Sequence, residues 1–217
     1  TIPFSDVIIT PKFFKKSFGK KHKTFNGFME LSYLHKKYFK PNLNIKKILG
    51  VYNEKYVIVR FVSWEASHDF GVRGLSDDDK IKLIKFISKK AKVFISSEKR
   101  LPKELNKYKL KLSPELMHDA LFYSSLHIGE GATLAAESAL LKTPTIYVNK
   151  LSLGYISELE KYGFLLTELN IGNILNLAEF ILDNKNTSFI NNKEINYEEK
   201  FDDTTDFMLK VIKKYES

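Results

Sequence analysis

The chain has 217 residues, 43% of them hydrophobic and 28% charged, which is enough to bury a sizeable core and excludes a disordered polymer. It contains no cysteine, which excludes disulfides, a thiol nucleophile and thiolate metal ligands and favours a cytoplasmic location. No apolar run approaches the roughly 20 residues of a bilayer-spanning helix, and the sequence starts at Thr1 without a signal segment, so we expect a fragment.

Residues 1–55 form a basic, aromatic connector. Residues 1–60 carry 13 lysine and arginine residues against three acidic residues, a net charge of +10, whereas the whole chain has +9. Lysines interleaved with aromatic residues occur on protein surfaces that bind nucleic acids or anionic membranes. No nucleic-acid motif accompanies them, so nucleic acid is not an expected partner, and peripheral contact with the inner membrane face is kept as an alternative.

The connector also predicts a burial pattern. We expect Phe25, Phe28 and Tyr33 to pack against the α/β layer, because long lysine side chains can cover apolar surface while their ammonium groups stay in water. The lysines expected to be exposed are Lys12, Lys15, Lys16, Lys20 and Lys21. Residues 6–11 predict a strand that stops at Pro11 and ends a preceding lobe, because a parallel strand needs neighbours.

From residue 56 to 185, β-branched runs alternate with amphipathic stretches, which is typical of an α/β layer fold. We therefore predict a Rossmann-like, mainly parallel sheet flanked by helices. The predicted strands are 56–62, 93–97, 126–129, 145–149 and 164–166, and the predicted helices are 76–87, 113–123, 132–141, 152–162 and 171–184. Residues 186–217 are predicted to form a polar linker and a C-terminal helix over 204–215.

One helix start is well marked in the sequence. Ser76 is a good N-cap, three aspartates follow it in the first turn, and Ile81, Ile84 and Ile87 recur at intervals of three residues. We expect a helix that begins directly after Ser76.

The densest candidate site runs from a predicted strand through two glycines into a helix. Gly129 and Gly131 would let backbone N–H groups approach an anion, and the helix that starts at Ala132 would add positive potential. Thr133 can donate a hydroxyl to a phosphate, and Glu137 can accept from ribose hydroxyls. The alternative is a tight turn followed by a solvated helix, because the full G-x-G-x-x-G pattern is absent.

Polar clusters follow other predicted strands at the same edge of the sheet. Ligands of open α/β sheets bind at the carboxyl ends of the strands, although each cluster alone would also suit an ordinary loop. The candidate residues in these clusters are Ser63, His68, Asp69, Ser97 and Glu98. His118, in the helix before the glycines, is a further candidate for a contact with a base. No metal site is expected, since no histidine shows metal-ligand spacing.

Two sets of motifs resemble known proteins. The string HDALFYSSLHIGEGATLAAESALLKTPTIYV resembles the second lobe of GT-B nucleotide-sugar enzymes. Together with SWEASHDFGVRGL and FNGFMELSYLH, it resembles the family known as domain of unknown function 354, over residues 2 to about 166. Lys142 stands where such loops usually carry glycine.

The resemblance implies roles for particular residues. Gly131, Ala132 and Thr133 match the turn that faces the donor diphosphate, and Glu137 matches the carboxylate that binds the ribose. Arg60 corresponds loosely to a phosphate contact. GT-B transferases generally need no bound metal, and their general base comes from the first lobe, so this chain alone is expected to be inactive.

The leading hypothesis is therefore the nucleotide-sugar-binding lobe of a GT-B-like glycosyltransferase, with a glycan or lipid-linked acceptor. The nucleotide sugar would be its substrate, and no cofactor is expected to stay bound. Two alternatives remain open. One is an enzyme similar to UDP-N-acetylglucosamine 2-epimerase, and the other is a non-catalytic module that binds polyanions or a membrane through the connector.

Overall fold

The structure, a computed structural model, describes residues 2–63, 74–151, 153–183 and 197–215. The chain divides into two compact units. We call Pro41–Asn192 the sheet unit, and Thr1–Lys40 with Lys193–Ser217 the terminal unit. The sheet unit includes residues 41–55, which the sequence places in the connector.

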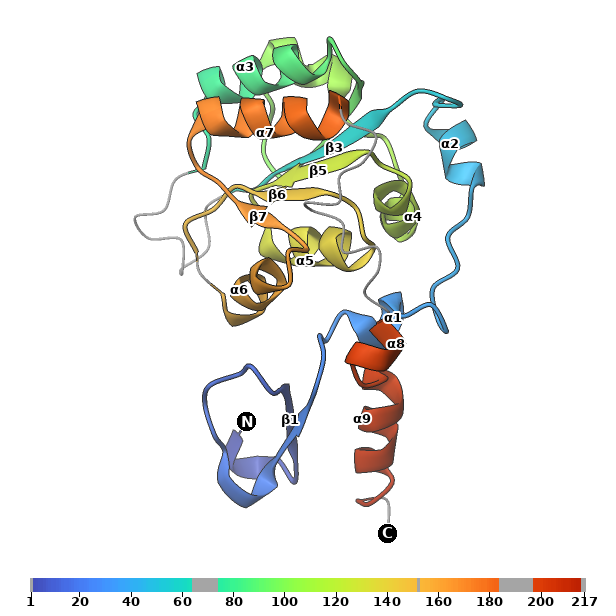
Figure 1. Cartoon of the computed structure of the whole chain (residues 1–217), viewed down its shortest axis with the longest axis vertical. Coiled ribbons are helices and arrows are strands. Elements are labelled where there is room, and N and C mark those ends of the chain that lie inside the picture. Colours follow the sequence, from blue (N-terminus) through green and yellow to red (C-terminus); the bar gives the residue numbers. More distant parts are fainter. Residues whose placement is uncertain (1, 64–73, 152, 184–196, 216–217) are drawn as a thin grey trace. The chain divides into compact units, whose positions relative to one another are not determined.

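Among the residues described, the sheet unit has one sheet of five parallel strands, which Figure 1 shows in part by label. In spatial order they are β4 (Lys92–Ser97), β3 (Tyr56–Phe61), β5 (Leu126–Gly129), β6 (Thr145–Tyr147) and β7 (Leu166–Thr167). The expected Rossmann-like α/β fold is confirmed. Within this sheet the strand that comes first in sequence, β3, lies between β4 and β5, so the strand order reverses there. Open α/β sheets bind their ligands at such a switch point.

Helices cover both faces of this sheet (Figure 1). One face carries α3 (Asp77–Ile87) and α7 (Ile171–Asp183), and the other carries α4 (Met117–Phe122), α5 (Ala132–Leu140) and α6 (Gly154–Lys161). Short helices precede them, namely α2 (Asn44–Ile48) and the 3-10 helices η3 (Lys103–Tyr108) and η4 (Pro114–Leu116). In the described ranges, none of the helices is long and apolar enough to cross a bilayer.

The core on the α3 side follows from the predicted periodicity. Of the three predicted isoleucines, Ile84 and Ile87 are fully buried, and Ile81 is half-buried against the same cluster. Leu83 is also fully buried, and the cluster includes inward residues of the strands, such as Val57 and Ile128. The helix also begins where the sequence predicts. The Ser76 hydroxyl oxygen accepts a hydrogen bond from the Asp79 N–H at 3.1 Å, which satisfies one of the free donors of the first turn.

The terminal unit joins the two ends of the chain. It contains η1 (Ile2–Phe4), β1 (Ile8–Pro11), η2 (Gly19–Lys21), β2 (His22–Phe25) and α1 (Leu31–Leu34), followed by α8 (Tyr197–Lys200) and α9 (Thr204–Ile212). The predicted strand ends at Pro11 as expected, and it pairs in parallel with β2, which the sequence does not predict.

The predicted burial of the connector is confirmed in part. Phe25 and Phe28 are buried as expected, but their ring partners belong to the terminal unit and not to the α/β layer: Phe25 contacts Phe207, and Phe28 contacts Phe13 and Phe201. Tyr33 is 43% exposed, so that prediction was wrong. Its helix buries the two leucines at its ends, three positions apart, and this spacing turns the Tyr33 side chain outward. The five lysines named above are exposed as expected.

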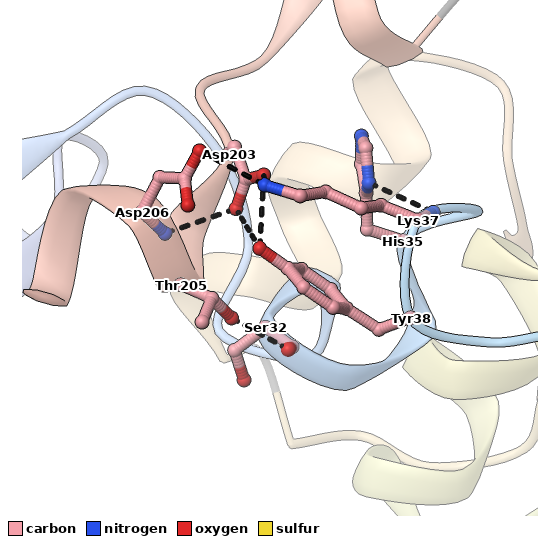
Figure 2. Close-up of polar contacts among 7 residues, drawn as sticks. All are labelled: Ser32, His35, Lys37, Tyr38, Asp203, Thr205 and Asp206. Atoms are coloured by element: carbon pink, nitrogen blue, oxygen red, sulfur yellow. Dashed lines mark hydrogen bonds and ion pairs between the residues drawn. The ribbon is translucent and has the colours of Figure 1, made fainter.

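A polar junction fastens α9 to the segment that follows α1 (Figure 2). Asp203 is the N-cap of α9, accepts from the Asp206 N–H at 3.0 Å, and also accepts from the Tyr38 hydroxyl at 3.0 Å. The Lys37 ammonium lies 3.1 Å from Asp203 and 3.0 Å from Asp206. Thr205 donates to the Ser32 carbonyl at 2.7 Å.

These contacts lower the pKa of Asp203 from 3.8 to about 2. Partial burial acts to raise this pKa, but the hydrogen bonds from the Asp206 N–H, Lys37 and Tyr38 outweigh it. Because the folded pKa is the lower one, the stabilisation by Asp203 is present above pH 3.8 and is lost as the pH falls toward 2.

We expect Asp203→Ala to speed amide hydrogen exchange throughout α9 at neutral pH, because removing the N-cap side chain lowers the stability of the helix by about 1 kcal/mol. Asp203→Asn keeps an N-cap acceptor, so most of that protection should remain while the acid-dependent part disappears. Hydrogen exchange measured at neutral pH and near pH 3 on both variants checks this. Equal acid sensitivity in Asp203→Asn and the wild type would contradict it.

Candidate functional site

A cavity of about 560 Å³ opens at the carboxyl ends of β3, β4 and β5, where the strand order reverses. We call it the switch-point cavity. Its volume lies within the range of small-molecule sites. Its walls come from the ends of these strands, from η4 and α4, and from the start of α5. The lining residues are Arg60, Val62, Ser96, Glu98, Leu112, Pro114, Met117, His118, Gly131, Ala132, Thr133, Leu134 and Glu137.

The cavity brings together seven of the candidate residues from the sequence. These are Arg60, Glu98, His118, Gly131, Ala132, Thr133 and Glu137. Ser63 adjoins them, because its backbone N–H donates to Glu98 at 3.0 Å. Gly129 and Ser97 are the last residues of β5 and β4 and do not line the cavity. His68 and Asp69 lie outside the described residues.

The start of α5 forms one wall of the cavity. Gly131 is its N-cap, and Thr133 lies in its first turn, as the sequence predicts. A Cβ at Gly131 would lie 3.2 Å from Val62 Cγ1, so glycine lets the start of the helix approach the end of β3. The first N–H groups of a helix have no acceptor within it and carry positive potential. Here they belong to residues that line the cavity.

Gly129 is needed for a different reason. A Cβ there would lie 2.6 Å from the Nε2 atom of His127, which is fully buried. The Nδ1 atom of His127 lies 3.1 Å from the Ile58 carbonyl oxygen, and burial lowers the pKa of this histidine to about 4. The ring is therefore neutral, and Nδ1–H donates to Ile58. Among the described residues, none forms a hydrogen bond with His127 Nε2.

Glu137 and His118 form a pair across the cavity wall. The Glu137 carboxylate lies 3.2 Å from His118 Nε2, and these residues come from α5 and α4. Glu137 is 9% exposed, so its carboxylate is held in place more firmly than a surface side chain. The pair presents oxygen and nitrogen atoms suited to hydrogen-bonding the hydroxyls of a sugar.

Arg60, expected to contact phosphate, already has protein partners. Its Nη1 donates to the Ser96 hydroxyl at 2.6 Å, and its Nη2 lies 2.5 Å from Glu98 Oε1. The other Glu98 oxygen accepts from the Ser63 N–H at 3.0 Å. The side chains are 26% exposed for Arg60 and 43% exposed for Glu98.

Glu130, between the two glycines, has a role that the sequence analysis missed. It is 1% exposed, and its carboxylate accepts from the Val62 N–H at 3.0 Å and the Leu75 N–H at 2.9 Å. Its backbone N–H donates to the Arg60 carbonyl, and its backbone carbonyl accepts from Asn149. Glu130 thus ties together both ends of the connection between β3 and α3.

Potential metal ligands do not cluster in the part of the chain that the structure describes. No group of three or more histidine or acidic side chains lies close enough there to hold an ion. The polar groups of the switch-point cavity include the Arg60–Glu98 pair, the Ser96 hydroxyl, the Glu137–His118 pair and the start of α5.

Comparisons with known proteins identify the fold. No protein-family model matches the chain, and no curated protein sequence matches it. A protein assigned as UDP-N-acetylglucosamine 2-epimerase from Listeria monocytogenes is similar in structure, with a TM-score of 0.60 and 14% identity. The match covers 88% of this chain and 53% of that protein. This likeness agrees with the expected Rossmann-like half of a GT-B fold, whereas no family model supports domain of unknown function 354.

Two other solved structures match with lower TM-scores. UDP-N-acetylglucosamine 2-epimerase from Methanocaldococcus jannaschii has a TM-score of 0.47 at 14% identity, over 66% of this chain and 44% of that one. The wall teichoic acid polymerase TagF has a TM-score of 0.48 at 14% identity, over 100% of this chain and 60% of that one. The chain spans about half the length of the solved structures it matches.

Proposed function

We propose that the switch-point cavity binds a nucleotide sugar, and that the chain is the donor-binding half of a GT-B-like glycosyltransferase. The observation that carries this proposal is the meeting, in one cavity, of a helix N-terminus with the Glu137–His118 pair. The first supplies donors for a diphosphate, and the second supplies partners for ribose hydroxyls. Each alone would be common in an α/β fold, but a nucleotide diphosphate needs both at one site.

The rest of the cavity suits the remaining parts of the ligand. The diphosphate would lie against the first turn of α5, where the Thr133 hydroxyl adds a side-chain donor. Leu112, Pro114 and Met117 provide an apolar wall on which a base would pack. The acceptor, a glycan or a lipid-linked molecule, would be held by protein beyond this chain, as would the general base. We therefore expect donor binding without turnover.

A second candidate is donor binding for epimerisation instead of transfer. It is favoured by the likeness in fold to the Listeria protein assigned as UDP-N-acetylglucosamine 2-epimerase. The two candidates differ in ligand preference, since an epimerase half should select UDP-N-acetylglucosamine over UDP-glucose and other nucleotide sugars. Calorimetric titration with a panel of nucleotide sugars compares them directly.

Glu137→Ala is expected to weaken nucleotide-sugar binding by about 1.5 to 3 kcal/mol, the usual range for hydrogen bonds to a charged group. His118→Gln should cost less, because Glu137 keeps its carboxylate. Isothermal titration calorimetry on variants with wild-type circular dichroism spectra measures both effects.

Glu104→Ala is the matched control, since Glu104 pairs with Lys85 outside the cavity. It should bind like the wild type. The proposal fails if Glu137→Ala binds as tightly as this control, or if the wild type binds no nucleotide sugar.

A further inference from the structure

The Glu98 carboxylate contacts two groups that could otherwise bind an oxyanion at this edge of the sheet, the Arg60 guanidinium and the Ser63 N–H. One of its carboxylate oxygens lies 2.5 Å from the Arg60 guanidinium, and the other accepts from the Ser63 N–H. A cationic side chain and a backbone N–H at a strand end are the usual partners of a bound phosphate. Arg60 lines the switch-point cavity, and the Ser63 N–H adjoins it through Glu98.

The geometry points to a second anion subsite, formed by Arg60, the Ser96 hydroxyl and the Ser63 N–H, which the Glu98 carboxylate fills until an oxyanion of the ligand displaces it. We propose that Glu98 is a specificity-determining residue that competes with the ligand. This inference deepens the proposed function, on which it rests, because it concerns a second charged group of the same donor.

Two observations favour displacement over a permanent structural pair. The Glu98 side chain is 43% exposed, and exposed ion pairs contribute little to stability, so releasing the carboxylate to water costs little. Its charge also faces a cavity that contains a second carboxylate, Glu137, and one arginine. A diphosphate that entered without displacing Glu98 would meet two negative charges and a guanidinium that is already paired.

The displacing oxyanion has two sources in a nucleotide sugar. One is a phosphate of the diphosphate, and the other is the carboxylate of an acidic sugar. The two share the same chemistry, a planar or tetrahedral set of oxygens that accepts from the guanidinium and the N–H together.

The test compares Glu98→Gln with the wild-type chain by calorimetric titration. Glutamine keeps the size of the side chain and removes its charge. We expect inorganic diphosphate and UDP to bind about threefold to tenfold more tightly to Glu98→Gln, the scale of one relieved charge contact, while uridine binding is unchanged. If the subsite takes a sugar carboxylate, UDP-glucuronate should gain affinity and UDP-glucose should not.

Two variants control this experiment. Glu104→Gln removes a carboxylate outside the cavity and should leave all affinities unchanged. Arg60→Gln should weaken diphosphate binding, and adding Glu98→Gln to it should then give no gain. In the wild type, the Ser63 amide resonance should shift on addition of diphosphate, because its acceptor changes.

The inference is overturned if Glu98→Gln binds every charged probe as weakly as the wild type, or more weakly, including the case in which neither binds. The proposed function fails separately. If Glu98→Gln gains diphosphate affinity but neither chain binds a nucleotide sugar, the anion subsite stands and the nucleotide-sugar proposal falls. If nucleotide sugars bind to the wild type and to Glu98→Gln with equal affinity, the nucleotide-sugar proposal stands and the anion subsite falls.

Discussion

Gly129→Ala is expected to lower the free energy of unfolding by about 2 kcal/mol or more, as overpacking of a filled core does. The added methyl carbon would lie 2.6 Å from Nε2 and 3.0 Å from Cε1 of His127. This ring is buried and held through Nδ1 by the Ile58 carbonyl, so it has little room to move. Urea unfolding followed by circular dichroism measures the loss.

A double-mutant cycle identifies the cause. His127→Ala alone should destabilise the chain by leaving a cavity, but Gly129→Ala added to it should cost little more, because the colliding ring is gone. Gly131→Ala is the matched control and should be milder, since its nearest neighbour is Val62 Cγ1 at 3.2 Å. Equal costs of Gly129→Ala with and without the His127 ring would show that the ring is not responsible.

Glu130→Ala is expected to lower the free energy of unfolding by about 2 to 3 kcal/mol. The change removes a buried acceptor shared by the N–H groups of Val62 and Leu75, and hydrogen bonds to charged groups are the strong ones. Glu130→Gln should cost less, because its amide oxygen can still accept from one of the two. Urea unfolding gives the totals, and hydrogen exchange at Val62 and Leu75 locates the change.

Glu104→Ala again provides the control, because the Glu104 side chain is 59% exposed and its loss should change stability by less than about 0.5 kcal/mol. An unfolding curve of Glu130→Ala that matches this control would mean that the two N–H groups find other partners at no cost.

Local patterns predicted the elements of the sheet unit well. The start of α3 depends on a contact between Ser76 and Asp79, three residues apart, which sequence spacing captures. The run from β5 through Gly131 into α5, which includes Glu137, is equally local. The rule that places ligands at strand ends made Glu98 a candidate in advance, whereas Arg60 was named only through the family resemblance.

Features that depend on distant partners were not predictable in this way. β2 is a strand because it pairs with β1, and its four residues, HKTF, carry little strand signal of their own. Phe25 and Phe28 each have a ring partner from the other end of the chain, Phe207 and Phe201.

The candidate site shows the same limit. From the sequence, Glu130 between two glycines would be expected to face solvent. It is buried because the fold brings the N–H groups of Val62 and Leu75 to its carboxylate. The sequence marked Arg60 and Glu98 separately, but their pairing depends on the register of β3 against β4. The close approach of Gly129 to the His127 ring did leave a signal in the sequence. The two residues are two positions apart in a strand, so they lie on the same face of the sheet.

The terminal unit is assembled from two segments that are synthesised at different times. Asn26 and Asp202, 176 residues apart, exchange hydrogen bonds of 2.6 and 2.7 Å. The sheet unit lies between the two segments of the terminal unit along the chain, so all of it is synthesised before Phe201 and Phe207. Phe28 can contact Phe13 early, but Phe207 and Phe201, the ring partners of Phe25 and Phe28 in the C-terminal segment, are synthesised much later. A chain truncated before Phe201 would therefore leave the Phe25 and Phe28 rings without these partners, as an exposed apolar surface prone to aggregation.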